Sequence, residues 1–232
     1  MILYGRNPVR EAIRAGRRPV RHVWATHGAA AEPWLRDAAV EIVAADEVSH
    51  RCGSEAHQGL CAQVGDYPYA APEDLLGAPD PLIVALDEVQ DPQNLGAICR
   101  SAECVGATGV VIPERRSAEV TPAVAKASAG AIEHLDVARV RNLADFLADA
   151  KAAGCWCYGA AVSDDALPYL EPDYRGGVVL VLGAEGKGLR PRVAGACDAL
   201  VALPMRGRIS SLNVSAAAAA LLYGILQRRN PA

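Results

Sequence analysis

Three short segments hold the polar and glycine residues that binding sites use, and each follows an apolar run. In the first, residues 82–86 lead into the acidic and amide residues 87–94, and Arg100 follows six positions after Asn94. Six helical residues turn the chain by about 600°, so Arg100 does not share a face with Asn94 but can reach back toward the strand end. A capping Asn and a surface Arg would explain the same residues without a functional role.

The second segment is a glycine loop, Gly-Ala-Glu-Gly-Lys-Gly at 183–188, which follows the apolar run 178–182. Glycine allows close backbone approach to a ligand and positive φ. The order G-x-x-G-x-G differs from the dinucleotide and Walker patterns, and the carboxylate of Glu185 opposes phosphate binding. The loop predicts a backbone-lined pocket for a ligand without phosphates, with a plain strand-to-helix turn as the alternative.

The third segment connects the apolar run 199–203 to a helix expected over 214–228. Pro204 ends the strand, and the loop beyond it contains Arg206, Arg208, Ser210, Ser211 and Asn213. These residues supply more hydroxyl and amide groups than a helix cap requires, although capping alone remains an alternative. Three such loops at strand ends in one domain indicate a shared ligand site.

The pattern around these segments predicts an α/β domain. Continuous apolar runs are found at 82–86, 108–112, 155–160, 178–182 and 199–203. Helical patterns are found at 95–105, 121–129, 143–153 and 214–228. Continuous runs are typical of parallel strands buried on both faces, and the ligand of such a sheet lies beyond the carboxyl ends of its strands.

The N-terminal part reads as a separate, smaller α/β unit. We expect helices at 8–15 and 33–39 and strands at 20–25, 41–43 and 59–64. A proline-rich stretch follows, which is typical of a linker. The expected organisation is therefore a small domain over 1–66, a linker over 67–80 and a larger domain over 81–232.

Composition bears on partners and compartment. Seven cysteines without a C-x-x-C pair indicate reduced thiols and no metal site. No run of ~18 uncharged apolar residues is present, and the first residues lack a signal-peptide core. We therefore expect a cytoplasmic protein with no membrane segment.

The net charge of -4 and the pI near 5.7 oppose a uniformly basic nucleic-acid binder, and an aromatic content of 5% opposes a platform of stacked rings. Local charge differs, because residues 1–25 contain six arginines and one acid. Local basic surface is what phosphates respond to, although a solvated basic face is the alternative. If the ligand is RNA, the residues expected to bind it are Arg6, Arg10, Arg14, Arg17, Arg18, Arg206 and Arg208.

Together, the three segments resemble the motifs of the SpoU branch of the SPOUT superfamily, which are S-adenosylmethionine-dependent RNA ribose 2′-O-methyltransferases. The family pattern of Asn and Arg six apart is similar to Asn94 and Arg100, its Gly-x-Glu-Gly-x-Gly to 183–188, and its Ser-Leu-Asn-Val-Ser to 211–215. Residues 4–12 resemble the start of the ribosomal-protein-like substrate-binding domain of the RlmB group. The resemblance implies a trefoil knot, a homodimer and a guanosine of 23S ribosomal RNA as target.

The resemblance also implies roles for individual residues. The implied catalytic residues are Asn94, Arg100, Glu185, Ser211 and Asn213. The implied cofactor-binding residues are Leu182, Gly183, Gly186, Leu203, Met205 and Leu212. Arg100 is expected to clamp a phosphate and stabilise the developing alkoxide, because a free-base arginine is costly.

Alternatives within and outside the family remain open at this point. The chain could be a non-catalytic RNA-binding assembly factor, or a methyltransferase of the same type acting on tRNA or another rRNA nucleotide. A nucleotide-binding α/β enzyme is disfavoured by the glycine order.

Overall fold

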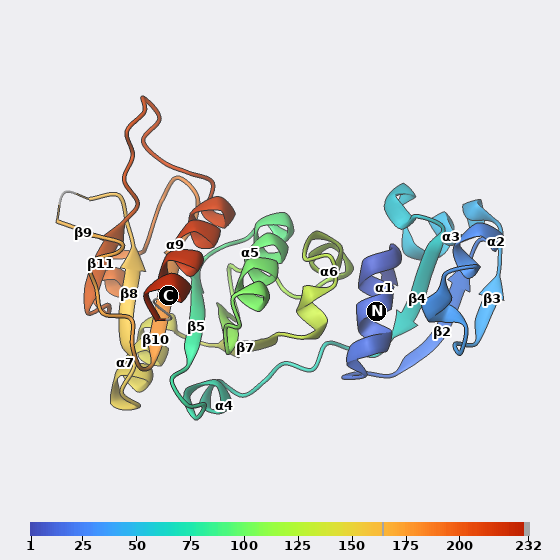
Figure 1. Cartoon of the computed structure of the whole chain (residues 1–232), viewed down its shortest axis with the longest axis horizontal. Coiled ribbons are helices and arrows are strands. Elements are labelled where there is room, and N and C mark those ends of the chain that lie inside the picture. Colours follow the sequence, from blue (N-terminus) through green and yellow to red (C-terminus); the bar gives the residue numbers. More distant parts are fainter. Residues whose placement is uncertain (164, 230–232) are drawn as a thin grey trace. The chain divides into compact units, whose positions relative to one another are not determined.

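The computed structural model describes residues 1–163 and 165–229, and it divides the chain into two compact units (Figure 1). The N-terminal unit combines Met1–Pro68 with Glu119–His134, and the second, which we call the sheet unit, combines Tyr69–Ala118 with Leu135–Ala232. The N-terminal unit is therefore discontinuous, because residues 119–134 return to it from within the sequence of the sheet unit.

The N-terminal unit is built on a four-stranded sheet in the order β1-β4-β2-β3, with only the β2–β3 pair parallel. Its strands are β1 (Ile2–Tyr4), β2 (Val20–Ala25), β3 (Val40–Ile42) and β4 (Leu60–Val64). Its helices are α1 (Arg6–Ala15), α2 (His27–Ala30), α3 (Ala45–Cys52) and α6 (Pro122–Ala127), with 3-10 turns η1 (Pro33–Leu35), η2 (Glu55–His57) and η3 (Ala131–Glu133). The helix expected over 33–39 is wrong, since only the η1 turn forms there.

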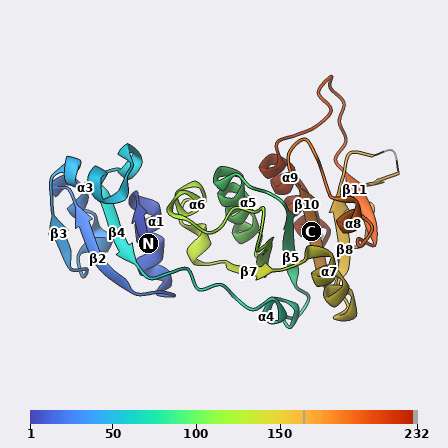
Figure 2. The ribbon, with the colours of Figure 1, turned by 180° about the vertical axis from the view of Figure 1, so that it is seen from behind.

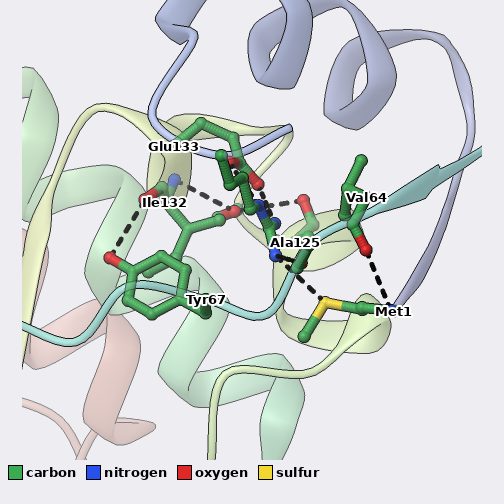
Figure 3. Close-up of polar contacts among 9 residues, drawn as sticks. Met1, Val64, Tyr67, Ala125, Ile132 and Glu133 are labelled. Carbon is green, nitrogen blue, oxygen red and sulfur yellow. Dashed lines mark hydrogen bonds and ion pairs between the residues drawn. The ribbon is translucent and has the colours of Figure 1, made fainter. Parts of the chain in front are cut away.

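A buried ion pair attaches the returning segment to the rest of the N-terminal unit. Arg18 and Glu133 have side chains that are 2% and 1% exposed, and Arg18 Nε donates to Glu133 Oε2 at 3.0 Å. A terminal nitrogen of Arg18 also donates to the Gly65 carbonyl at 3.1 Å. Nearby, the Tyr67 hydroxyl donates to the Ile132 carbonyl at 3.2 Å (Figure 3). Burial and these contacts remove Arg18 from the expected RNA-binding set.

Close packing of α1 against the returning segment requires a glycine. Gly130 has φ +88°, and a Cβ there would lie 2.8 Å from the Cβ of Glu11 and 2.9 Å from the Asn7 carbonyl oxygen. His134 Nε2 lies 2.9 Å from Glu11 Oε2 at the other end of this turn. The segment therefore contacts α1 through backbone and side chain alike.

The sheet unit contains a seven-stranded sheet in the order β7-β6-β5-β10-β8-β11-β9, with every pairing parallel. Strands β7, β5, β10, β8 and β11 of this sheet are labelled in Figure 2. Its strands are β5 (Leu82–Asp87), β6 (Gly109–Pro113), β7 (Asp136–Val140), β8 (Trp156–Ala160), β9 (Leu167–Pro168), β10 (Val178–Gly183) and β11 (Ala199–Ala202). Its helices are α4 (Pro72–Leu76), α5 (Pro92–Cys104), α7 (Leu143–Ala152), α8 (Pro191–Ala194) and α9 (Val214–Arg229). The parallel sheet expected from the continuous apolar runs is confirmed.

Helices cover both faces of this sheet. On one face, Ile83 and Val181 belong to a core shared with Leu75 of α4, Phe146 of α7 and Val193 of α8. Neighbouring strand residues such as Val84 and Leu180 are also fully buried and point to the opposite face, because side chains alternate along a strand. There α5 and α9 pack against each other, with α9 also in contact with β10.

Arg229 fixes the end of α9, the helix that follows the third motif. Its guanidinium donates to four carbonyl oxygens at 2.6–3.1 Å, those of Asp80, Pro81, Tyr174 and Gly176. Backbone carbonyls at the start of β5 and before β10 are thereby satisfied by one side chain. The orientation of α9 is thus held at its C-terminal end, independently of the polar residues at its start.

The expected linker and the order of the strands also differ from the expected pattern. Residues 67–80, expected as a linker, contain α4, and its Leu75 is buried in the core of the sheet unit. Strand β10 pairs between β5 and β8, so the order of strands in space departs from their order along the chain. The trefoil knot remains a prediction.

The buried pair gives a first testable prediction. Replacing Glu133 by Gln leaves the Arg18 cation buried without an anion, which costs about 3–5 kcal/mol. We expect the urea unfolding transition of the N-terminal unit, followed by the fluorescence of Trp24 and Trp34, to lose stability by that amount. Glu47→Gln, at the exposed Arg51–Glu47 pair, is the matched control and should change stability by less than about 1 kcal/mol. Equal effects of the two substitutions would contradict the structural role of Arg18.

Candidate functional site

A cavity of about 720 Å³ lies beyond the carboxyl ends of the central strands of the sheet unit. Its lining comes from the ends of β8, β10 and β11 and from the start of α9. All six expected cofactor-binding residues line it, together with Glu185, Ser211 and Asn213 of the expected catalytic set. This cavity therefore lies at the strand-end location expected from the sequence.

The glycine loop forms one wall of the cavity by folding back on itself. Ala184 and Gly188 form a bridge, in which Gly188 N donates to the Ala184 carbonyl at 2.9 Å. A Cβ at Gly183 would lie 2.2 Å from the carbonyl carbon of Gly188. The glycine at 183 therefore makes room for the loop itself, whereas Gly186 (φ +74°) and Gly188 (φ +65°) supply left-handed backbone.

The three motifs meet at one carboxylate oxygen. Glu185 Oε1 accepts hydrogen bonds from Asn94 Nδ2 at 3.2 Å, from Asn213 Nδ2, and from the Val214 N–H at 3.4 Å. Asn213 Nδ2 also donates to Asn94 Oδ1 at 3.0 Å. Residues up to 119 positions apart are thereby joined in a single hydrogen-bonded network.

Each asparagine is positioned by the start of a helix. Asn213 Oδ1 accepts from the Ser215 N–H at 2.9 Å and from the Ser215 hydroxyl at 2.6 Å, so it caps α9 while its amide nitrogen reaches Glu185. Asn94 is not the cap of α5, because Asp91 accepts from the Gln93 N–H at 2.9 Å. It lies within the first turn and is buried, 8% exposed. The starts of α5 and α9 therefore contain both the capping groups of these helices and the asparagines of the site.

Arg100 and Ser211 lie outside this network. Arg100 is exposed in the second half of α5, and within residues 1–163 and 165–229 it has no hydrogen bond or ion pair. Ser211 lines the cavity but makes no hydrogen bond to the network among the described residues. Both side chains are thus accessible to a bound molecule.

The arginines expected to bind RNA are distributed over both units. Arg206 and Arg208 are exposed in the loop that leads to the cavity. Arg6, Arg10 and Arg14 recur every four residues along α1 and so lie on one side of it. Arg6 pairs with Glu32 at 2.8 Å and Arg10 with Glu11 at 2.8 Å, and Arg17 lies over the Tyr67 ring.

Several cavity residues were not anticipated from the sequence. Ala160 at the end of β8 and Ala161 and Val162 just after it line the cavity, and Ala217 and Leu221 line it from α9. The first three lie at the carboxyl end of a predicted parallel strand, so the strand-end rule that indicated the other loops also applies to them.

The thiols and the metal-binding side chains do not form a second site. Burial raises the pKa of Cys99 and of Cys157 to about 12, which keeps both thiols protonated and unreactive. Among the residues the structure describes, no group of three or more His, Cys, Asp and Glu side chains is arranged to hold a metal ion. None of the described helices is long and apolar enough to cross a membrane.

A Ser–His–Glu cluster in the N-terminal unit has the composition of a hydrolase triad but the opposite proton arrangement. Ser49 Oγ lies 3.0 Å from His57 Nε2 and donates to Glu55 Oε2 at 3.1 Å, and the Gly59 N–H donates to His57 Nδ1 at 2.8 Å. Because Nδ1 is an acceptor, the proton of a neutral imidazole is on Nε2. His57 therefore donates to Ser49 and cannot take its proton, as a triad requires.

Fold and site together define a class of protein. A parallel sheet covered by helices has a large cavity at the carboxyl edge of its strands. The glycine loop that lines this cavity folds back on itself, contains a carboxylate and lacks a phosphate-binding pattern. Comparison with protein families identifies that class: residues 81–223 match the SpoU rRNA Methylase family and residues 2–70 match the RNA 2′-O ribose methyltransferase substrate-binding family. The chain belongs to the SpoU family of RNA methyltransferases.

Individual relatives agree with this assignment. The chain is 47% identical over 182 residues to the putative TrmH family tRNA/rRNA methyltransferase YacO of Bacillus subtilis (strain 168), covering 75% of this chain and 72% of that protein. The crystal structure of the SpoU methyltransferase AviRb from Streptomyces viridochromogenes with AdoMet superposes with a TM-score of 0.82 at 27% identity, over 98% of this chain and 89% of that one. A solved RNA 2′-O ribose methyltransferase gives a TM-score of 0.81 at 25% identity, over 98% and 88%.

The cofactor of the family is S-adenosylmethionine, and the cavity suits a molecule of its chemistry. Its volume is within the ~300–1,000 Å³ range of small-molecule sites. Apolar residues such as Leu203 and Leu221 would hold an adenine ring, and the Lys187 ammonium would face the carboxylate of the amino acid part.

A glycine substitution tests this wall of the cavity. Gly183→Ala places a methyl group against the backbone of Gly188 and Leu189, which must then separate. We expect affinity for S-adenosylmethionine, measured by calorimetry, to fall at least tenfold, which corresponds to about 1.4 kcal/mol. Gly207→Ala is the control, because nothing lies within 4 Å of a Cβ at that position. Unchanged affinity in Gly183→Ala would show that close packing of Gly188 and Leu189 against Gly183 is not needed for binding.

Proposed function

We propose that this protein transfers a methyl group from S-adenosylmethionine to a ribose 2′-hydroxyl, with a guanosine of 23S ribosomal RNA in the cytoplasm as target. The observation that carries the proposal is the convergence of Asn94, Glu185 and Asn213 beside the cavity. A solved RNA 2′-O ribose methyltransferase of similar fold supports the ribose target, and the substrate-binding family match supports the RNA substrate.

The residues of the network act by orientation. When bound, the cofactor supplies an electrophilic methyl group. The chain must align the ribose hydroxyl with that group and allow the hydroxyl to lose its proton. Holding reactants in line accounts for several kcal/mol of a barrier. Asn213 uses both amide N–H groups on Asn94 Oδ1 and Glu185 Oε1, so it orients Asn94. Asn94 keeps one amide N–H beyond its bond to Glu185, and this is the fixed donor that the network presents to the ribose. Ser211 adds a hydroxyl at the cavity wall.

Arg100 supplies positive charge. It is exposed and without a partner among the described residues, so it is available to an RNA phosphate. A guanidinium stays protonated in proteins and presents a fork that matches phosphate oxygens. We assign it to clamping the RNA phosphate and stabilising the developing alkoxide.

The proposal includes a homodimer built on the trefoil-knotted part of the sheet unit. Helix α9 supports it, because Leu222 and Ile225 are buried within the unit while Tyr223 is 53% exposed on another face. A single species of monomer mass in sedimentation at micromolar concentration would contradict the dimer.

Arg100→Ala tests the catalytic assignment. Loss of one group that stabilises transition-state charge lowers kcat by about 10²–10³-fold. The measurement is tritium transfer from labelled S-adenosylmethionine to ribosomal RNA, free and in partly assembled particles, with calorimetry to show that cofactor affinity is unchanged. Arg141→Ala, another exposed arginine of the sheet unit, should retain full activity. If wild type labels no RNA and Arg100→Ala behaves identically, the protein is a binding factor rather than an enzyme.

Mapping the modified nucleotide tests the substrate. Primer extension at low nucleotide concentration stops at 2′-O-methylated positions, so wild-type and deletion strains should differ at one guanosine of 23S ribosomal RNA. If ribosomal RNA methylation is the same in both strains and the deletion strain lacks a 2′-O-methyl group in tRNA, the substrate is tRNA.

The arginines of α1 give a prediction on salt dependence. Each phosphate contact contributes about one to the slope of log affinity against log salt concentration. We expect the double variant Arg10→Ala/Arg14→Ala to lower this slope by about two in filter-binding assays with 23S fragments. Arg36→Ala, an exposed arginine outside α1, should leave it unchanged, and an unchanged slope in the double variant would remove α1 from the interface.

A further inference from the structure

A carboxylate to which the three motifs assign no role lies at the end of β5. Asp87 is 0% exposed, and Arg190 supplies its partners: the Arg190 N–H donates to Oδ2 at 2.8 Å, and Nε donates to Oδ1 at 2.7 Å. A terminal nitrogen of Arg190 lies 2.6 Å from Oδ1 as well. A buried carboxylate requires such compensation, and here it comes from the backbone and the side chain of one residue.

Asp87 thereby fixes both ends of the glycine loop. Its backbone is the register partner of Gly183 in the β5–β10 pairing, which fixes the start of the loop. Its side chain holds Arg190, two residues after Gly188, which fixes the exit. The residues between are confined between two points set by one residue, and Glu185 is among them.

Glu88 adds a second contact to the same arginine. Glu88 Oε1 lies 3.3 Å from a terminal nitrogen of Arg190, and the Glu88 side chain is 15% exposed. Glu88 has φ +61°, a conformation that non-glycine residues rarely adopt. Arg190 is thus held between successive carboxylates at the end of β5, one of them on unfavourable backbone.

We propose that Asp87 and Arg190 are positioning residues that set the glycine loop in the conformation that binds S-adenosylmethionine. Neither residue is among those lining the cavity in the described part of the chain, so both act through the loop and not by touching the cofactor. The inference rests on the proposed placement of the cofactor in this cavity. Arginine is required over lysine because its planar guanidinium places two nitrogens on Asp87 Oδ1 and the third on Glu88, a spread that a single ammonium nitrogen does not have.

The test compares Arg190→Lys and Arg190→Gln with Arg192→Gln, a control two residues away whose exposed pair with Asp145 spans 2.9 Å. Calorimetric titration with S-adenosylmethionine should show about tenfold weaker binding in Arg190→Lys and a larger loss in Arg190→Gln. At saturating cofactor, the bound molecule holds the loop, and Glu185 with it, in the binding conformation, so the kcat of Arg190→Lys should stay within about twofold of wild type. Arg192→Gln should match wild type throughout.

If Arg190 has a purely structural role, its substitution lowers the melting temperature but does not weaken cofactor binding while kcat stays unchanged. Should Arg190→Gln fail to fold, the double variant Asp87→Asn/Arg190→Gln replaces it, because it leaves no unpaired buried charge. Wild-type affinity in Arg190→Lys would overturn the inference, as would a loss of kcat at unchanged affinity.

Ala217→Phe separates this inference from the proposed function. Ala217 lines the cavity on α9, so a phenyl ring there occupies the space assigned to the cofactor. If Ala217→Phe abolishes binding while Arg190→Lys binds normally, the positioning inference alone fails. If Ala217→Phe binds as well as wild type, the cofactor placement fails, and the inference fails with it.

Discussion

The acceptance of three hydrogen bonds by one oxygen of Glu185 is the interaction on which the geometry of the site depends. Hydrogen bonds to a charged acceptor contribute about 1.5–3 kcal/mol each. The donors come from the first turn of α5 and the start of α9, and the acceptor comes from the loop after β10. Without this carboxylate, the amide nitrogens of Asn94 and Asn213 would lose their shared acceptor and would donate to water instead. Their orientation toward a substrate would then be lost.

The parallel sheet makes this convergence possible. In a parallel sheet all carboxyl ends lie at one edge, so loops that are distant in sequence share a neighbourhood. Two further contacts limit the freedom of the central loop: it crosses over Gly183 with no space for a side chain, and Asp87 holds its exit through Arg190. The site is consequently rigid at its base, whereas Arg100, Arg206 and Arg208 are exposed and free of such constraints.

The sequence predicts the parts of this arrangement that depend on local pattern. Apolar runs identify β5 and β10 because both are buried along nearly their whole length. Strand β7 was missed because Asp136 and Arg139 interrupt its apolar residues at the edge of the sheet. The roles of Asn94, Glu185 and Asn213 were indicated by a family resemblance. Their mutual hydrogen bonds were not, since spacing along the chain does not determine which oxygen accepts.

The arginines near the N-terminus show most clearly that spacing along the chain does not determine contacts. The six arginines of residues 1–25 predict one basic cluster, yet Arg18 forms a buried ion pair with Glu133, which lies 115 residues away in the chain. The pairs of Arg6 and Arg10 are different, because ion pairs at a surface contribute only about 0–1 kcal/mol. An RNA phosphate carries a full charge and releases counterions on binding, so it can displace Glu32 or Glu11 at small cost. It cannot displace Glu133, whose pair is buried and is part of the fold.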